Sequence, residues 1–158
     1  MANNYESGAT HVTADCFAPG GAETAVLING ELQDILSQED RPEEFEDFYS
    51  DCLDVEMGSD GSLYISSGDE YFCSPSFEYL IEKLAERKLL IKSFGLSVAY
   101  YCSKLRPDEH GGVYYRALPS GEVLAISTQL DDLTDEQLRH LVNVREHPSQ
   151  YTSAPDAA

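Results

Sequence analysis

Regularly spaced carboxylates are the side chains in this sequence whose pattern most clearly predicts a binding surface. Glu43, Asp47 and Asp51 recur every four residues within the segment DRPEEFEDFYSDCLD, residues 40–54. In a helix they would stack along one face, rising about 6 Å per four residues. Two phosphates along one DNA strand cover about the same axial distance, so the row predicts a rigid mimic of a nucleic-acid backbone. The predicted partner-binding residues are Glu39, Asp40, Glu43, Glu44, Glu46, Asp47, Asp51 and Asp54.

The negative charge is concentrated in the first half of the chain. Residues 1–82 contain 19 Asp and Glu and a single basic residue, Arg41, whereas residues 83–158 contain 10 acidic and nine basic residues. A one-sided field attracts a basic partner and repels nucleic acids and anionic membranes. The solvated face of an ordinary acidic protein explains a charge run equally well. Halophilic adaptation is disfavoured, because it would acidify both halves.

The histidines and cysteines lack the spacing of a metal site or a catalytic motif. The sequence has no C-x₂₋₄-C or H-x₃₋₅-H pair, no EF-hand pattern, no G-x-S-x-G elbow and no phosphate-binding glycine loop. We therefore predict no cofactor, no dedicated metal site and no enzymatic activity, although a Cys–His pair could still assemble in space. The residues concerned are His11, His110, His140 and His147, and Cys16, Cys52, Cys73 and Cys102, the cysteines being expected as buried thiols.

Hydrophobic periodicity predicts the elements that would position the acidic row. Helices are expected at residues 31–37, 40–54 and 76–89, and between Thr134 and Pro148. Strands are expected at residues 9–17, 23–28, 63–65, 71–73, 93–102, 113–118 and 122–127. Residues 63–65 and 71–73 are expected to pair as a hairpin. In the helix at 40–54, the apolar arc would be Phe45, Phe48, Tyr49, Cys52 and Leu53.

The grouping of these elements predicts an α+β fold. Because the strands come in hairpin-linked groups, we expect a mainly antiparallel sheet with about four helices packed on it. Residues 1–148 are expected to form a single domain and residues 149–158 a disordered tail. No stretch approaches the roughly 20 apolar residues of a membrane span, and the N-terminal residues do not resemble a signal peptide.

Two pairs of adjacent tyrosines lie on predicted strands, Tyr100-Tyr101 and Tyr114-Tyr115. Neighbouring residues on a strand point to opposite faces of the sheet. One ring of each pair should therefore point away from the core, unless a further layer covers it.

These features predict a cytoplasmic protein that acts by binding, without catalysis. Its acidic surface would block the basic cleft of a nucleic-acid-handling protein as a DNA or RNA mimic, without binding nucleic acid or membranes. An inhibitor of a host defence nuclease or a CRISPR effector, carried by a phage or mobile element, is the concrete form of this hypothesis. Three alternatives stay open: an immunity or antitoxin-like protein that neutralises a basic toxin, a small enzyme with a Cys/His pocket, and a homo-oligomer joined through acidic and basic halves.

Overall fold

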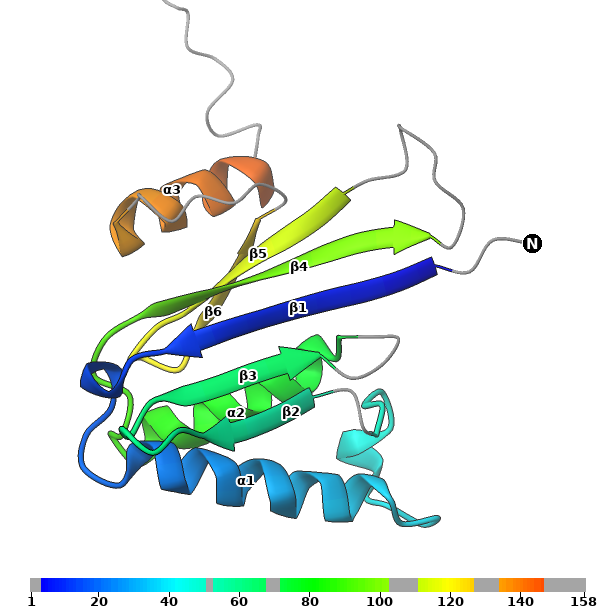
Figure 1. The fold of residues 1–158 in the computed structure, drawn as a ribbon. Coiled ribbons are helices and arrows are strands. Elements are labelled where there is room, and N and C mark those ends of the chain that lie inside the picture. Colours follow the sequence, from blue (N-terminus) through cyan, green and yellow to red (C-terminus); the bar gives the residue numbers. More distant parts are fainter. Residues whose placement is uncertain (1–3, 51–52, 68–71, 103–110, 127–133, 147–158) are drawn as a thin grey trace, which may run out of the picture.

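A six-stranded sheet forms the centre of the computed structural model, which describes residues 4–50, 53–67, 72–102, 111–126 and 134–146 (Figure 1). The spatial order of the strands is β2-β3-β1-β4-β5-β6, and every described pairing is antiparallel. The strands are β1 (Asn4–Val12), β2 (Leu53–Met57), β3 (Leu63–Ser67), β4 (Phe94–Cys102), β5 (Gly111–Ala117) and β6 (Val123–Ile126). The prediction of a mainly antiparallel α+β sheet is confirmed.

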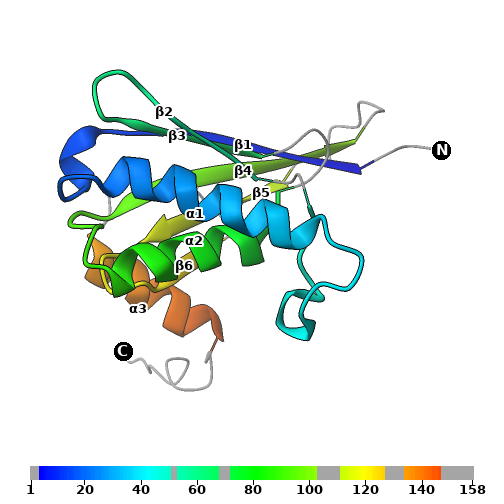
Figure 2. The same cartoon turned by 90° about the horizontal axis from the view of Figure 1, so that it is seen from below.

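Helices cover both faces of the sheet, but unequally. Helices α1 (Gly21–Leu36) and α2 (Ser74–Glu86) lie side by side on one face, and α3 (Asp135–Glu146) lies across the other face beside β5 and β6 (Figures 1 and 2). Two short 3₁₀ turns, η1 (Ala14–Cys16) and η2 (Glu43–Phe45), complete the described elements. The described chain thus has three α-helices where about four were predicted.

The main core lies between the sheet and the α1–α2 layer. Phe77, Leu80 and Leu84 of α2 are fully buried there, against Leu96 and Val98 of β4. A smaller core lies on the other face, where Leu138 and Val142 of α3 pack against Leu124 of β6. The sheet therefore has buried apolar side chains on both of its faces.

The adjacent tyrosines of β5 point to opposite faces, as predicted. Tyr114 is buried in the core beneath α3, and Tyr115 packs against the main core. The ring that faces away from the main core is therefore covered by a further layer, which is α3. The side chains of Tyr100 and Tyr101 lie outside the described part of the structure.

The chain between residues 21 and 36 is one continuous helix, which corrects the predicted strand at 23–28 and the separate helix predicted at 31–37. Buried residues recur with helical spacing along it: Ala22, Ala25, Ile28, Asn29, Leu32 and Leu36. The helix begins after Gly20, whose φ of 81° is in the left-handed region that glycine adopts without strain. The buried amide of Asn29 donates a hydrogen bond to the Leu53 carbonyl at 3.1 Å, which ties α1 to the edge strand β2.

The predicted helix at 40–54 does not form, and this prediction is wrong. Residues 43–45 make a single 3₁₀ turn, and the strand β2 begins at Leu53. A helix would have buried Tyr49 together with Phe45, but Tyr49 is 66% exposed and Phe45 only 6%. Acidic residues at helical spacing repel one another, while the alternation of Leu53 and Val55 allows residues 53–57 to pair with β3 instead.

Two further strand predictions need correction. β3 pairs with β2, through Val55↔Ile65, and with β1, through Thr10↔Ile65, so both of its edges are occupied by strands other than the predicted partner. Phe72 and Cys73 instead enter the core just before α2, because their side chains are apolar and the helix begins at Ser74. The first strand spans 4–12 where 9–17 was predicted, because residues 14–16 turn into η1.

The helix predicted after Thr134 is confirmed as α3, and a capping box opens it. The Gln137 amide N–H donates to the Thr134 hydroxyl at 3.1 Å, and the Thr134 N–H donates to the Gln137 side chain at 2.9 Å. Both bonds satisfy donors that the first turn of a helix leaves free. Pro148 and the predicted tail at 149–158 lie outside the described residues.

Lys88 ends α2 in a conformation that favours glycine. Its φ is 56°, and the N–H groups of Lys88 and Leu89 bond to the carbonyls of Ala85 and Leu84. Because only glycine adopts this region without a steric cost, we expect Lys88→Gly to stabilise the fold by about 0.5–1 kcal/mol. Urea unfolding measures this gain. A Lys88→Ala variant controls for the loss of the charge because it keeps a Cβ at this position, and equal stability of both variants would contradict the prediction.

Candidate functional site

The predicted partner-binding residues lie on two different faces of the molecule. Six of them are exposed on the segment that joins α1 to β2, residues 37–50, which we call the acidic loop. These six are Glu39, Asp40, Glu43, Glu44, Glu46 and Asp47. Asp54 is also exposed but belongs to β2, and Asp51 lies outside the described residues. The loop has no helical stack of carboxylates at every fourth residue, since it forms only one 3₁₀ turn.

Aromatic side chains hold the acidic loop against both α1 and α2. Phe45 is buried against Leu32 and Leu36 of α1. Its ring meets two others edge-on: the centre of the Phe48 ring lies 5.2 Å from that of Phe45, and the centre of the Tyr79 ring of α2 lies 5.6 Å away. Such aromatic pairs contribute roughly 0.5–1.5 kcal/mol beyond the area they bury. The carboxylates between these rings are therefore presented on an anchored segment.

The outer face of α1 adds three carboxylates that the sequence analysis did not identify. Glu23, Glu31 and Asp34 are all exposed and, at 100° per residue, lie within an 80° arc of the helix. They were missed because this segment was divided into a strand, a break and a short helix. The spacing of the buried residues along 22–36 was the signal that could have revealed them. We call these three residues and the six of the acidic loop together the acidic surface.

The one basic residue among the described residues of the first half stands within this acidic surface. Arg41 is partly buried, and its Nη1 atom is buried without a hydrogen-bond partner among the described residues. Lys83 of α2 lies 5.3 Å from the centre of the Tyr79 ring and pairs with Glu86 at 3.4 Å. The exposed groups of the acidic surface are thus almost entirely carboxylates.

Asp54 faces a different surface, the side of the sheet opposite α1. Leu53 and Val55 point into the core, so Asp54 and Glu56 point the other way. Across the sheet, Glu56 lies opposite Tyr64, whose ring stacks on His11 with ring centres 4.6 Å apart. The structure therefore separates Asp54 from the acidic loop.

Asp60 holds the tight turn between β2 and β3. Its carboxylate accepts hydrogen bonds from the Ser62 hydroxyl and from the Ser62 N–H, the latter at 3.1 Å, and these bonds lower the pKa of Asp60. A carboxylate whose pKa is lowered by folding stabilises the fold above its unfolded pKa, and this stabilisation disappears as pH falls through the folded pKa.

We therefore expect Asp60→Asn to lose stability relative to wild type at pH 7. The two proteins should become equally stable as the pH falls below the usual aspartate range and through the lowered pKa of Asp60. Urea midpoints across this pH range measure the difference. Glu56→Gln removes a nearby carboxylate outside the turn and serves as the control. A constant difference between Asp60→Asn and wild type at every pH would contradict the prediction.

A polar pocket of about 490 Å³ lies where α3 meets the sheet, and an ion pair forms part of its wall. Arg116 of β5 is 6% exposed and donates to the Tyr114 hydroxyl at 3.1 Å and to Asp135 at 3.2 Å. Asp135 also accepts a hydrogen bond from Ser93 at 2.9 Å. Burial disfavours the charge of Arg116, but the bonds to Tyr114 and Asp135 outweigh it and raise its pKa. These contacts attach the first turn of α3 to β5, which is a structural role.

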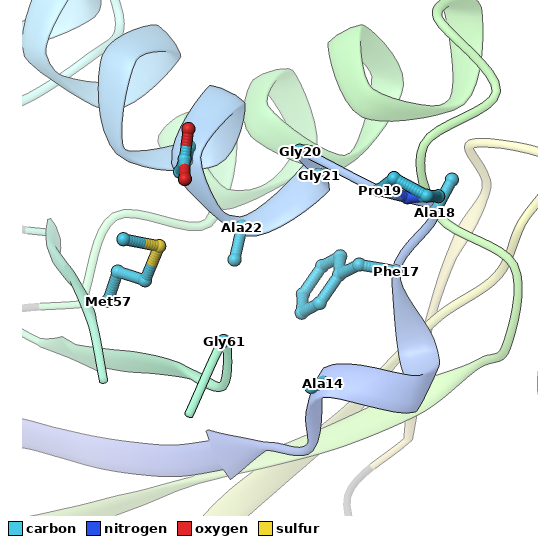
Figure 3. A pocket seen from close by; sticks show the side chains of 10 residues that line it. Ala14, Phe17, Ala18, Pro19, Gly20, Gly21, Ala22, Met57 and Gly61 are labelled. Atoms are coloured by element: carbon cyan, nitrogen blue, oxygen red, sulfur yellow. The ribbon is translucent and has the colours of Figure 1, made fainter. Parts of the chain in front are cut away.

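A second pocket, of about 260 Å³, lies at the start of α1 (Figure 3). The side chains of Phe17, Ala14, Ala22 and Met57 form most of its wall, and Gly61 lies at its side. This wall is mostly apolar, with Glu23 as its charged residue, and it carries no imidazole, thiol or hydroxyl side chain. The pocket can therefore hold an apolar group but offers little for catalysis.

Cys16 and Cys73 are buried, whereas His11 and His140 are exposed; the side chain of Cys102 lies outside the described part of the structure. Cys16 and Cys73 are free thiols, and Cys73 contacts the Ser76 hydroxyl at 3.1 Å. His11 and His140 lie on the surface, whereas Cys52, His110 and His147 fall outside the described residues. Within the described ranges, no group of three or more His, Cys, Asp or Glu side chains is placed to hold a metal ion.

Comparison with protein-family models, with curated proteins and with solved structures gives no match for this chain. None of the described helices has the length and apolar character needed to cross a bilayer. The functional argument therefore depends on the charge and geometry of the surfaces described above.

Proposed function

We propose that this protein binds a basic, nucleic-acid-binding surface of a partner protein and blocks it. The observation that carries the proposal is the acidic surface, in which the carboxylates of α1 adjoin those of the acidic loop. Figure 2 shows the acidic loop at the C-terminal end of α1, from which the chain continues into β2. An inhibitor of a defence nuclease or a CRISPR effector is one function of this kind.

Rigidity supports binding to a nucleic-acid site in particular. Glu31 and Asp34 are separated by about 4.5 Å along the axis of α1, which is comparable with the 3.4 Å axial step of phosphates on one DNA strand. The packing of Phe45 against Leu32 and Leu36 holds the acidic loop beside this helix. A backbone anchored in this way loses little further conformational entropy on binding, so more of the Coulomb attraction remains as affinity.

Affinity capture with the full-length chain tests the proposal. The immobilised protein is exposed to lysate at low and high salt, and the bound proteins are identified by mass spectrometry. We expect a basic nucleic-acid-binding protein that is released by high salt and displaced by DNA or RNA, because both polyanions would compete for one site. A bound protein that added DNA and RNA do not displace would contradict the mimic mechanism.

Head-to-tail self-association is a second candidate, supported by the position of the basic residues. The exposed bases Arg87, Lys88 and Lys92 lie on the connection from α2 to β4, at the opposite end of the molecule from the acidic loop (Figure 1). Lys92 already pairs with Asp15 at 2.8 Å, whereas Arg87 and Lys88 extend from the end of α2. Sedimentation at increasing salt tests this candidate, since oligomers joined by these charges should dissociate.

A further inference from the structure

An exposed leucine stands in the middle of the acidic surface. Leu27 is 66% exposed on the outer face of α1, and Glu23 and Glu31 lie one helical turn before and after it. A single exposed apolar side chain is common on protein surfaces. This leucine, however, lies among carboxylates, and the residue one turn further along the same face is also unusual.

That residue is Gly30, which is exposed within the interior of α1. Glycine at such a position makes folding roughly fivefold less favourable than alanine does. A Cβ added to Gly30 would meet nothing within 4 Å. By contrast, a Cβ on Gly21 of the same helix would collide with Phe17 at 2.8 Å. The packing of this chain therefore requires a glycine at 21 but not at 30.

The two residues form one local surface. At 100° per residue, Leu27 and Gly30 lie 60° apart and one turn apart on α1, with Glu23, Glu31 and Asp34 around them. This gives a protruding apolar side chain beside a bare stretch of helix backbone, framed by carboxylates. Glycine is the residue that permits close approach of another backbone or ligand. Charged side chains around an apolar centre are also the usual anatomy of a protein–protein interface.

We infer that the outer face of α1 docks on a basic protein surface, where Leu27 fills an apolar recess and Gly30 allows the partner's backbone to approach the helix. The inference rests on the proposed function, because the carboxylates define the partner as cationic. It adds that binding depends on apolar contact as well as on charge. A nucleic acid or a plain polycation has no recess for Leu27, and carboxylates would repel the former.

Two synthetic helical peptides serve as probes of this face. The first has arginines along one side and leucines along the other, and the second has every leucine replaced by serine. We expect the leucine peptide to bind the full-length protein about tenfold more tightly than the serine peptide by calorimetry. In ¹⁵N spectra, the leucine peptide should shift the amides of residues 23–34.

Two variants of α1 make the test specific. Leu27→Ala should remove most of the tenfold preference, because apolar anchors contribute a large share of interface affinity. Gly30→Gln should also remove it by blocking close approach, although it should raise Tm by roughly 2–4 °C. Loss of binding together with a gain in Tm separates an effect on docking from damage to the fold. Leu141→Ala, at an exposed leucine of α3, is the matched control and should leave the preference unchanged.

Equal binding of the two peptides, or a preference that survives both α1 variants, would overturn the inference. The proposed function has a separate readout, since it requires that the serine peptide binds through charge. If amide substitutions in the acidic loop weaken the serine peptide while Leu27→Ala changes nothing, the acidic surface keeps its role and only the docking face is wrong. If those amide substitutions have no effect on either peptide, the proposed function itself is contradicted.

Discussion

Replacing Glu43, Glu44 and Asp47 by their amides is expected to slow association with a basic partner by on the order of tenfold or more at low salt. These three carboxylates are exposed on the acidic loop and have no described basic partner. Their removal weakens the long-range attraction that guides two charged surfaces together. The fold should be unaffected, because the loop is anchored by Phe45 and not by its charges. Association rates from surface plasmon resonance, measured with the captured partner at several salt concentrations, give the result.

A matched control removes the same number of charges elsewhere. Asp54, Glu56 and Glu136 are exposed on β2 and α3, away from the acidic surface, and their amide variants should retain nearly the wild-type association rate. The difference between the two triple variants should shrink as salt rises, since surface charges are screened within about 8–10 Å at physiological salt. Equal loss of rate in both triple variants would mean that only net charge matters, and the acidic surface would lose its assignment.

Phe77→Ala is expected to cause the largest loss of stability, about 3–5 kcal/mol. Phe77 is fully buried between α2 and the sheet. The centre of its ring lies 5.8, 6.1 and 6.2 Å from the ring centres of Phe72, Phe94 and Tyr115. Truncation removes the contacts to all three rings and leaves a cavity that a close-packed core refills only in part. Because a whole domain is typically stable by only 5–15 kcal/mol, the melting temperature should fall by roughly 6–20 °C.

Thermal and urea unfolding followed by circular dichroism measure this effect. Tyr64→Ala provides the control, because Tyr64 is 48% exposed on β3 and its removal leaves no cavity in the main core. We expect the control to lose less than about 1 kcal/mol. A loss for Phe77→Ala as small as that of the control would show that the region between α2 and the sheet is not the centre of the core.

In the segments that were predicted correctly, the local sequence pattern and the tertiary contacts favour the same secondary structure. In β4, residues alternate between buried Leu96 and Val98 and less buried neighbours, which is the period of a half-buried strand. The capping box of Thr134 and Gln137 acts within one turn of helix, so its two hydrogen bonds need no long-range partner. In such places local pattern and global packing favour the same structure.

The two largest errors in the predicted secondary structure both concern segments whose apolar residues suit more than one element. The run ETAVLI resembles a strand, but the buried positions at 22, 25, 28 and 32 continue a helical stripe on both sides of it. The segment 40–54 has a helical pattern, yet its end belongs to a strand. Leu53 and Val55 lie in β2, which pairs with β3 in the sheet. Periodicity alone cannot distinguish these outcomes, because the deciding contacts come from residues far away in the sequence.

The acidic surface, too, was predictable from the sequence only in part. The excess of carboxylates in residues 1–82 is a property of the sequence, and it already predicts a basic partner. That Asp54 belongs to another face, and that Glu23, Glu31 and Asp34 belong to this one, follows only from the pairing of β2 with β3 and from the continuity of α1.

The sequence by itself determined the α+β class and the concentration of charge, because composition and short-range periodicity act through neighbouring residues. The tertiary structure alone decided which carboxylates share a surface, since strand register and helix packing set the direction of each side chain. It also decided that Leu27 and Gly30 stay on the outside of α1, since the buried stripe of that helix faces α2 and β2. Charge per segment is additive along a chain, whereas the face on which a charge appears depends on contacts between distant residues.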